Sequence, residues 1–365
     1  MAKFSEVLTI VNGRNQKQVV CDDGKYPIYG SGGIMGYAND YICKAETVVI
    51  GRKGSINKPI FVETPFWNVD TAFGLCANSE KLNPKYLYYF CEKFDFEKLN
   101  TTVTIPSLTK SNLLNVEIPL PNLEKQKQIV ELLDKVTSLI SLRKQQLAKL
   151  DELVKARFVE MFGDVLLNSM QWPEKTLENM ADIVSGITKG RKTAEADLQE
   201  VPYMAVSNVK DGYIDWTTVK TILATRQEIE QYRLMPDDIL MTEGGDPDKV
   251  GRGAIIKVPL KNSIHQNHIF RVRLDEQEIL PSFFAEYLRH QKAKRYFLGC
   301  AKQTTGIASI NMRQLRALPT LVPPLSLQKQ FATFVARIDQ QKQTVQQSLE
   351  KLELMKKALM QEYFG

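Results

Sequence analysis

Residues 121–163 read PNLEKQKQIVELLDKVTSLISLRKQQLAKLDELVKARFVEMFG, and residues 323–365 read PPLSLQKQFATFVARIDQQKQTVQQSLEKLELMKKALMQEYFG. The two stretches align at a constant offset of 202 residues, and the alignment continues without a gap back to residues 105 and 307. Identical positions along it include Ser107 and Ser309, Leu113 and Leu315, Gln126 and Gln328, and Gly163 and Gly365. A duplication of this length predicts a pseudo-symmetric molecule with two similar lobes.

Each copy of the repeat is expected to form one long helix, over residues 122–163 and 325–365. Residues 122–162 contain neither Gly nor Pro, and the second copy lacks both between Pro324 and its final glycine. A proline before such a stretch and a glycine after it are typical helix boundaries. At a rise of 1.5 Å per residue, each helix would be about 60 Å long.

The apolar residues of both helices recur at alternating steps of four and three, which is the heptad pattern of a coiled coil. In the first helix they are Ile129, Leu133, Val136, Ile140, Leu147, Leu150, Val154 and Met161. In the second they are Phe331, Val335, Ile338, Val345, Leu349, Leu352, Leu359 and Tyr363. Polar residues interrupt each seam at Arg143, Arg157, Lys342 and Lys356. We predict that the two helices pack on each other as an antiparallel coiled coil, with long helices of an ordinary bundle as the alternative.

The segments before the helices, residues 1–121 and 164–324, are predicted to be α+β globular domains. Short β-rich runs occur at residues 47–50, 60–62, 239–242, 254–258 and 269–274, and helical patterns occur at 84–98 and 281–297. The two segments align loosely, residues 48–50 with 239–241 and residues 72–73 with 269–270. They have diverged far more than the helices, as expected if the two lobes recognise different targets.

The composition is that of a globular protein without a membrane span. Hydrophobic residues make up 43% and charged residues 25%, and no run of 18 apolar residues occurs. The first residues lack the apolar stretch of a signal peptide, so we expect a cytoplasmic protein. The net charge of +6 is compatible with a polyanionic partner. Five separate cysteines, Cys21, Cys43, Cys76, Cys91 and Cys300, are expected to be reduced and mostly buried.

Several strings suggest enzymatic sites, but their spacing or composition is wrong. GITKGRKT (186–193) has three residues between its glycines where a phosphate-binding loop needs four, and GSGGIMG (30–36) lacks the third glycine of a dinucleotide fingerprint. We interpret the latter as a flexible turn. The acidic group near Lys249 has Pro247 where a metal-dependent nuclease needs an acid. His265 and His268 begin a strand and would point to opposite faces. No catalytic residue and no metal ligand is therefore predicted.

Polar loops rich in Arg, Lys, Asn, Gln, Ser and Gly remain in both lobes. Arg and Lys bind guanine or phosphate, Asn and Gln read adenine, and Gly lets backbone amides approach a polyanion. For any single residue a solvated surface loop is the alternative interpretation. The candidate DNA-binding residues are Tyr29, Ser31, Arg52, Lys53, Ser55, Asn57, Lys58, Asn68 and Thr102 in the first lobe and Lys189, Arg191, Lys192, Glu243, Gly244, Gly245, Asp246, Lys249, Arg252, Gln266, Asn267, His268, Lys302, Gln303, Thr304 and Thr305 in the second.

Longer motifs carry a family resemblance that covers the whole chain. EGGDPDKVGRG (243–253), HQNHIFRVR (265–273) and AKQTTGIASIN (301–311) resemble the target recognition domain of the specificity (S) subunit of Type I restriction and modification enzymes. The first lobe contributes YPIYGSGGIMGY (26–37) and VIGRKGSI (49–56). PLPNLEKQ (119–126) and VPPLSLQ (322–328) open the two helices as in that family.

The resemblance implies a non-catalytic subunit that reads double-stranded DNA for phage defence. It implies two target recognition domains, residues 1–121 and 164–324, held apart by two conserved spacer helices. Two adenine methyltransferase (M) subunits would dock on the helices, and restriction (R) subunits would add to that core. S-adenosylmethionine would be bound by the M subunits, and ATP and Mg would also be bound by partner subunits rather than by this chain.

Aligned loop positions differ in charge between the lobes, Arg52 and Lys53 against Glu243 and Gly244. A carboxylate accepts from cytosine N4, whereas arginine prefers guanine O6 and N7. We therefore expect the two lobes to read different half-sites of an asymmetric, two-part target. The competing hypotheses are an enzyme that itself modifies DNA, which would need a catalytic site, and a coiled-coil scaffold, against which the divergent polar loops argue.

Overall fold

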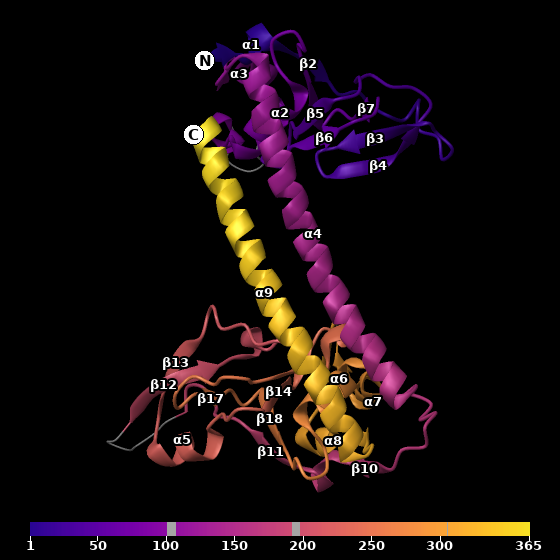
Figure 1. Cartoon of the computed structure of the whole chain (residues 1–365), viewed down its shortest axis with the longest axis vertical. Helices are drawn as coiled ribbons and strands as arrows, with labels where there is room; N and C mark the ends of the chain where they lie inside the picture. Colours follow the sequence, from indigo (N-terminus) through magenta and orange to yellow (C-terminus); the bar gives the residue numbers. More distant parts are fainter. Residues whose placement is uncertain (101–106, 192–197, 305) are drawn as a thin grey trace. The chain divides into compact units, whose positions relative to one another are not determined.

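The computed structural model describes residues 1–100, 107–191, 198–304 and 306–365. By its internal contacts the chain forms two compact units. Unit 1 comprises Met1–Gln146 and Val345–Gly365, and unit 2 comprises Leu147–Thr344. The division falls within both long helices, α4 (Leu123–Phe162) and α9 (Leu325–Phe364), so each unit combines a globular α+β part with one segment of each helix (Figure 1). The recognition-domain boundaries at residues 121, 163 and 324 stay a prediction.

The globular part of unit 1 is built on two sheets. A four-stranded antiparallel sheet has the order β2-β8-β5-β6, formed by Leu8–Asn12, Ala72–Ala77, Thr47–Gly51 and Ile60–Val62. A three-stranded sheet has the order β4-β3-β7, formed by Gly33–Ala38, Tyr26–Gly30 and Trp67–Asn68, with β3 and β7 parallel. The remaining elements are β1 (Ala2–Lys3), which pairs with β9 (Glu117–Ile118), and the helices α1 (Phe4–Val7), α2 (Pro84–Lys93), η1 (Phe96–Leu99) and α3 (Lys110–Leu114).

Unit 2 repeats this topology. Its four-stranded sheet has the order β11-β18-β14-β16, formed by Ala181–Ser185, Ile269–Leu274, Ile239–Thr242 and Gly253–Ile255. Its three-stranded sheet has the order β13-β12-β17, formed by Lys220–Ala224, Gln199–Met204 and Ile264–His265, again with one parallel pair. The remaining elements shared with unit 1 are β10 (Glu174–Thr176), which pairs with β21 (Pro319–Leu321), and the helices η2 (Leu177–Asn179), α6 (Pro281–Arg289) and α8 (Met312–Arg316).

The two four-stranded sheets match residue by residue at their central strands. Ile50 of β5 lies opposite Phe73 of β8, and Met241 of β14 lies opposite Phe270 of β18. The aligned pairs of the sequence comparison, 48–50 with 239–241 and 72–73 with 269–270, therefore occupy equivalent places in the two sheets. The predicted mixed fold class with two repeated lobes and two long helices is confirmed.

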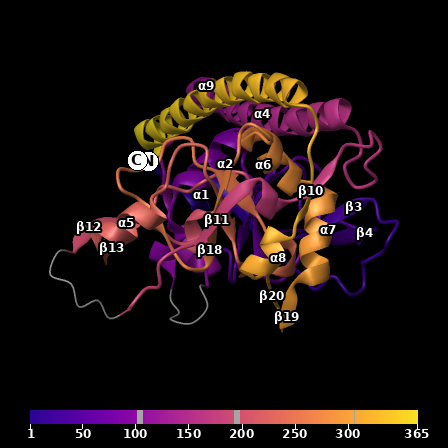
Figure 2. The same ribbon diagram turned by 90° about the horizontal axis from the view of Figure 1, so that it is seen from below.

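Unit 2 also contains elements without a counterpart among the described residues of unit 1. These are α5 (Arg226–Tyr232), α7 (Gln291–Cys300), the 3-10 turns η3 (Val206–Asn208) and η4 (Pro247–Lys249), and the strand β19 (Lys302–Thr304), which extends a small sheet with β20 (Ile307–Ser309) and β15 (Gly244–Gly245). Figure 2 shows α5 beside β12 and β13, whereas β19 and β20 lie near α7 and α8. The additions thus enlarge two different sides of the second domain.

Within each unit the segments of α4 and α9 run antiparallel. In unit 1, Ile129, Val130 and Leu133 share a buried cluster with Met360 and Phe364, and Lys144 pairs with Glu353 at 2.8 Å. In unit 2, Lys342 pairs with Asp151 at 2.5 Å, and the rings of Phe158 and Phe331 lie 5.4 Å apart. All predicted seam residues are buried or half-buried. The polar interruptions are half-buried, and Lys342 and Lys356 make ion pairs there.

A helix of each domain joins the helix pair to the sheet. In unit 1, α2 supplies Tyr86, Leu87 and Phe90 to the cluster that holds both sheet residues and the two long helices. In unit 2, Phe283 of α6 contacts Phe158 and Phe162 of α4, with ring centroids 5.3 and 4.7 Å apart. The aromatic residues at the ends of the long helices, outside the predicted seam, thus belong to the domain cores.

Several local predictions were wrong. The pattern at 84–98 is broken after α2 because Asp95 caps the N-terminus of η1, where its side chain accepts the N–H of Glu97. The pattern at 281–297 is broken at His290, whose extended backbone separates α6 from α7. The run at 254–258 forms a strand only to Ile255. In GSGGIMG only the residues between β3 and β4 form the turn, and residues 33–36 are part of β4. Two cysteines are buried and three half-buried.

Candidate nucleic-acid interface

One group of candidate residues in unit 2 gathers where β14 ends and β18 begins. Glu243 follows β14 directly; its N–H donates to the carbonyl oxygen of His268 (3.0 Å), and its carbonyl oxygen accepts the N–H of Ile310 (2.8 Å). His268 Nδ1 lies 2.7 Å from Glu243 Oε2. Gly244 and Gly245 pair with β20, and β20 pairs with β19, which contains Lys302, Gln303 and Thr304. The small sheet joins two candidate loops, and the contacts of Glu243 with His268 add a third.

A second group surrounds the 3-10 turn η4. Asp246 makes an ion pair with Lys249, and the hydrogen bond from that ammonium lowers the pKa of Asp246. Lys249 and Arg252 line a hollow of about 400 Å³ together with Lys294 of α7. Lys294 was missed by sequence reasoning because it lies 42 residues further along the chain than Arg252, in a helix that the pattern did not resolve. The hollow is also lined by Asp211, so its three cations outnumber its one carboxylate, and such an excess suits a phosphate backbone.

A third group lies where β11 and β17 end. Asn267 donates its N–H to the carbonyl oxygen of Ile187 (3.0 Å), and Ser185 Oγ donates to the carbonyl oxygen of Asn267 (2.7 Å). These bonds hold the loop with Gln266 and Asn267 against the loop with Lys189, whose side chain is exposed. Arg191 forms two bonds to Glu228 of α5, at 2.6 and 2.5 Å, and this guanidinium lowers the pKa of Glu228. In the free protein Arg191 thus fixes the loop.

In unit 1 the loop after β5, which corresponds to the loop after β14 in unit 2, carries exposed cations. Arg52 and Lys53 follow β5, and both are exposed, as are Ser55 and Lys58. The N–H of Arg52 donates to the carbonyl oxygen of Thr71 (2.8 Å), and its carbonyl oxygen accepts the N–H of Leu108 (2.9 Å). Its guanidinium lies 5.8 Å from the ring centroid of Phe73.

Other candidates of unit 1 serve the fold. Asn68 is fully buried, and its amide donates to the carbonyl oxygen of Ala72 (3.1 Å). Asn57 donates to Asp95 (2.8 Å) and accepts the N–H of Phe96 (2.7 Å), which ties its loop to η1. Tyr29 packs its ring edge-on against Phe66, and Ser31 is half-buried in the β3–β4 turn. Thr102, Lys192 and Thr305 lie outside the described residues.

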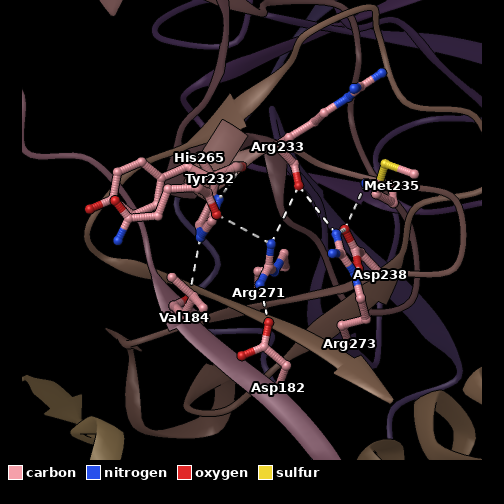
Figure 3. Close-up of polar contacts among 10 residues, drawn as sticks. Asp182, Val184, Tyr232, Arg233, Met235, Asp238, His265, Arg271 and Arg273 are labelled. Atoms are coloured by element: carbon pink, nitrogen blue, oxygen red, sulfur yellow. Dashed lines mark hydrogen bonds and ion pairs between the residues drawn. The ribbon is translucent and has the colours of Figure 1, made fainter. Parts of the chain in front are cut away.

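We call the side of each unit that carries these candidate loops its recognition edge. In unit 2 a polar network around the buried Asp238, His265 and Arg271 supports this edge (Figure 3). Arg273 binds Asp238 with two bonds of 2.7 and 2.8 Å, and Arg271 pairs with Asp182. His265, on β17, has its ring nitrogens 3.3 Å from the carbonyl oxygens of Tyr232 and Val184, and burial lowers its pKa to about 4. Side chains of β17 and β18 therefore fasten the end of α5 to the main sheet. Arg271 and Arg273 are two residues apart in one strand, so the sequence already indicated that both side chains lie on the same face of the sheet.

Ser107 and Ser309 are further residues that the candidate set missed. Ser107 forms a β-bridge with Lys53, and Ser309 pairs with Gly244 in the same way. The sequence did contain a signal for them, because the two serines are identical residues at aligned positions of the repeat. Both hold the segment that crosses the recognition edge.

In the described part of the chain, no group of three or more His, Cys, Asp and Glu side chains is placed to hold a metal ion. None of the described helices has the length and apolar character needed to cross a bilayer.

Comparison with known families shows which family has this duplicated architecture. The model of the Type I restriction modification DNA specificity domain matches residues 1–152 and again residues 170–354. The chain belongs to this family. The two matches correspond to the two halves of the internal repeat, and they confirm the resemblance seen in the recognition motifs.

Curated relatives and solved structures agree with this assignment. The chain is 22% identical over 307 residues to the specificity subunit of the Type I restriction enzyme EcoKI of Escherichia coli, and 25% identical over 311 residues to that of StySPI of Salmonella potsdam. Each match covers 80% of this chain and 65% of the relative, so the chain spans just under two thirds of their length. The S subunit of a Type I system from M. genitalium has the same fold, with a TM-score of 0.62 at 18% identity over 100% of this chain and 95% of that one.

Proposed function

We propose that this chain is the DNA-reading specificity subunit of a Type I restriction and modification complex. Each recognition domain would read one half of an asymmetric, two-part site in double-stranded DNA, and the subunit itself would catalyse no reaction. The observation that carries the proposal is that one fold occurs twice with the same strand register but different side chains at its recognition edge. A shared frame with divergent loops is suited to reading two unlike sequences.

The proposed DNA contacts come from the exposed members of the candidate groups and from the half-buried Glu243 and Arg252. They are Arg52, Lys53, Ser55 and Lys58 in unit 1 and Lys189, Glu243, Lys249, Arg252, His268, Lys302 and Gln303 in unit 2. Backbone amides of Gly244 and Gly245 and the half-buried Gln266 and Asn267 border them. Asn57, Asn68 and Arg191 would position these loops from within. Arginine and lysine would supply phosphate and guanine contacts, and the carboxylate would accept from a base amino group.

The long helices are proposed to dock two methyltransferase subunits, to which restriction subunits add. Leucines outside the seam support this role: Leu132, Leu139 and Leu142 of α4 are 38%, 44% and 55% exposed. Three exposed leucines within three turns of one helix are typical of a surface that a partner covers. S-adenosylmethionine, ATP and Mg are proposed to be bound by those partner subunits. The complex would act in the cytoplasm, in defence against phage.

The proposal is tested by mapping adenine methylation in the DNA of a host that expresses the complex with and without this chain. We expect methylation that depends on the chain and falls on a non-palindromic site of two short parts separated by unread bases. Exchange of residues 164–320 for the same segment of a relative is expected to change one part and to leave the other, because each domain carries its own recognition edge. A continuous palindromic site, or a change in both parts, would contradict the two-reader function.

A further inference from the structure

Arg52 and Glu243 occupy the same backbone position in the two units. Each is the first residue after a matched central strand, β5 or β14. Each donates its N–H to the residue directly before the next strand of the sheet, and each accepts an N–H from the segment that crosses the recognition edge. Side chains of opposite charge therefore start from equivalent points of two superimposable frames.

The carboxylate of Glu243 stands at a surface hollow. The hollow measures about 390 Å³ and is lined by Val206, Glu243, Gly244, His268 and Ser309. The side chain of Glu243 is 33% exposed and that of His268 is 57% exposed, so both are open to a ligand. The imidazole at 2.7 Å orients the carboxylate. Since a carboxylate offers about four lone-pair sites, it can accept from a further donor while it stays bound to His268.

The guanidinium of Arg52 presents the reverse chemistry. It has five N–H donors and no acceptor, in a planar arrangement that matches two neighbouring acceptors. Its position over the ring of Phe73 limits the directions in which it can extend. Guanine presents two acceptors, O6 and N7, in the major groove, whereas cytosine N4 and adenine N6 present donors there.

We propose that Glu243, oriented by His268, reads the exocyclic amino group of a base in the major groove, and that Arg52 reads guanine at the matching position of the other half-site. This inference rests on the proposed function and deepens it. The amino group belongs to cytosine or to adenine, and base selection distinguishes the two. His268 is a positioning residue, because it acts on the base through the carboxylate.

The test measures binding of the whole complex, this chain with its methyltransferase subunits, to duplexes in which one half-site at a time is randomised. Glu243→Arg is expected to replace cytosine or adenine by guanine at one position of the second half-site, with a change in preference of about 10- to 100-fold. Arg52→Glu is expected to do the converse in the first half-site. His268→Asn is expected to weaken the discrimination at the same position as Glu243→Arg without changing the preferred base.

Glu276→Gln is the matched control, because Glu276 is an exposed carboxylate just beyond the other end of β18. Glu243→Gln keeps the shape of the side chain and provides a second measurement of base preference if Glu243→Arg does not fold. Unchanged preference at every position in Glu243→Arg and Glu243→Gln, in complexes that still select the wild-type site, would overturn this inference and leave the proposed function intact. A wild-type complex that selects no two-part site would overturn both.

Discussion

His265 is a buried imidazole whose protonation carries a cost for the fold. Its two ring nitrogens face carbonyl oxygens of β11 and of the end of α5, and burial lowers its pKa from 6.5 to about 4. The charged groups packed near it are Arg271, which lowers the pKa further, and Asp238, which opposes this effect. The residue is therefore neutral in the folded protein at neutral pH.

We expect the free energy of unfolding of unit 2 to fall as the pH decreases from about 6.5 to about 4. In this window the unfolded chain binds a proton at His265 and the folded chain does not, so the loss reaches at most about 1.4 kcal/mol per pH unit. Denaturant unfolding of the wild type and of His265→Gln at several pH values measures it. Equal slopes in wild type and His265→Gln would contradict the assignment.

At the scale of single residues, the sequence predicted the chemical character of the candidate side chains better than it predicted whether they are accessible to a ligand. Arg52 and Glu243 were identified as a charge difference at aligned positions, and the structure places them at equivalent points. Asn68 and Asn57 were selected as polar loop residues, yet their amides are used by the protein's own backbone and by Asp95. Whether an amide faces outward depends on contacts with residues far away in the sequence, and a local pattern does not contain them.

At the scale of elements, each long helix is anchored to its domain by one buried glutamine. Gln126 accepts the N–H of Asn83 (2.8 Å) and donates to the carbonyl oxygens of Lys81 (3.0 Å) and Pro121 (2.8 Å). Gln328 of α9 accepts the N–H of Leu280 (2.8 Å) and donates to two carbonyl oxygens in the same way. The joint between helix and domain is thus the same in both halves, which accounts for the first glutamine of the repeated Gln-Lys-Gln sequence.

We expect Gln126→Ala to destabilise unit 1 by about 1–3 kcal/mol, because it leaves the part-buried N–H of Asn83 and two carbonyl groups without their partner. Gln128→Ala is the matched control, since Gln128 is exposed two residues further along the same helix. Denaturant unfolding monitored by circular dichroism gives both values. If the two variants proved equally stable, the buried amide would not be an anchor.

The long helices were predictable because a heptad pattern is local and recurs over many turns. The shorter helices were not, since the breaks at Asp95 and His290 occur within continuous amphipathic patterns. Phe158, Phe162 and Phe364 were also missed as core residues. They lie at the helix ends, where the helices contact the domains and a second face becomes buried.

At the scale of the whole molecule, the continuity of α4 and α9 predicts different effects of insertions of different length. Two extra residues after Leu150 rotate the following part of the seam by about 200°, whereas four rotate it by about 40° more than a full turn. We therefore expect the two-residue insertion to abolish assembly with the methyltransferase subunits and the four-residue insertion to preserve it. The four-residue helix is longer by about 6 Å, so the unread spacer would grow by at most about two base pairs.

The mass of the purified complex and the methylated site of each variant measure these effects. Normal assembly of the two-residue variant with the original spacer would contradict the paired-helix arrangement.

The division of unit 1 between the two ends of the sequence has a consequence for protein synthesis. Phe90 of α2 contacts both Phe4 and Phe364, with ring centroids 5.7 and 6.1 Å apart, whereas unit 2 is one continuous segment. Because a chain leaves the ribosome in order, the core of unit 2 is complete once Thr344 has emerged. Unit 1 begins first but must keep part of its apolar surface uncovered until its last helix segment arrives. All residues of unit 2 are therefore available for folding before unit 1 has its last helix segment.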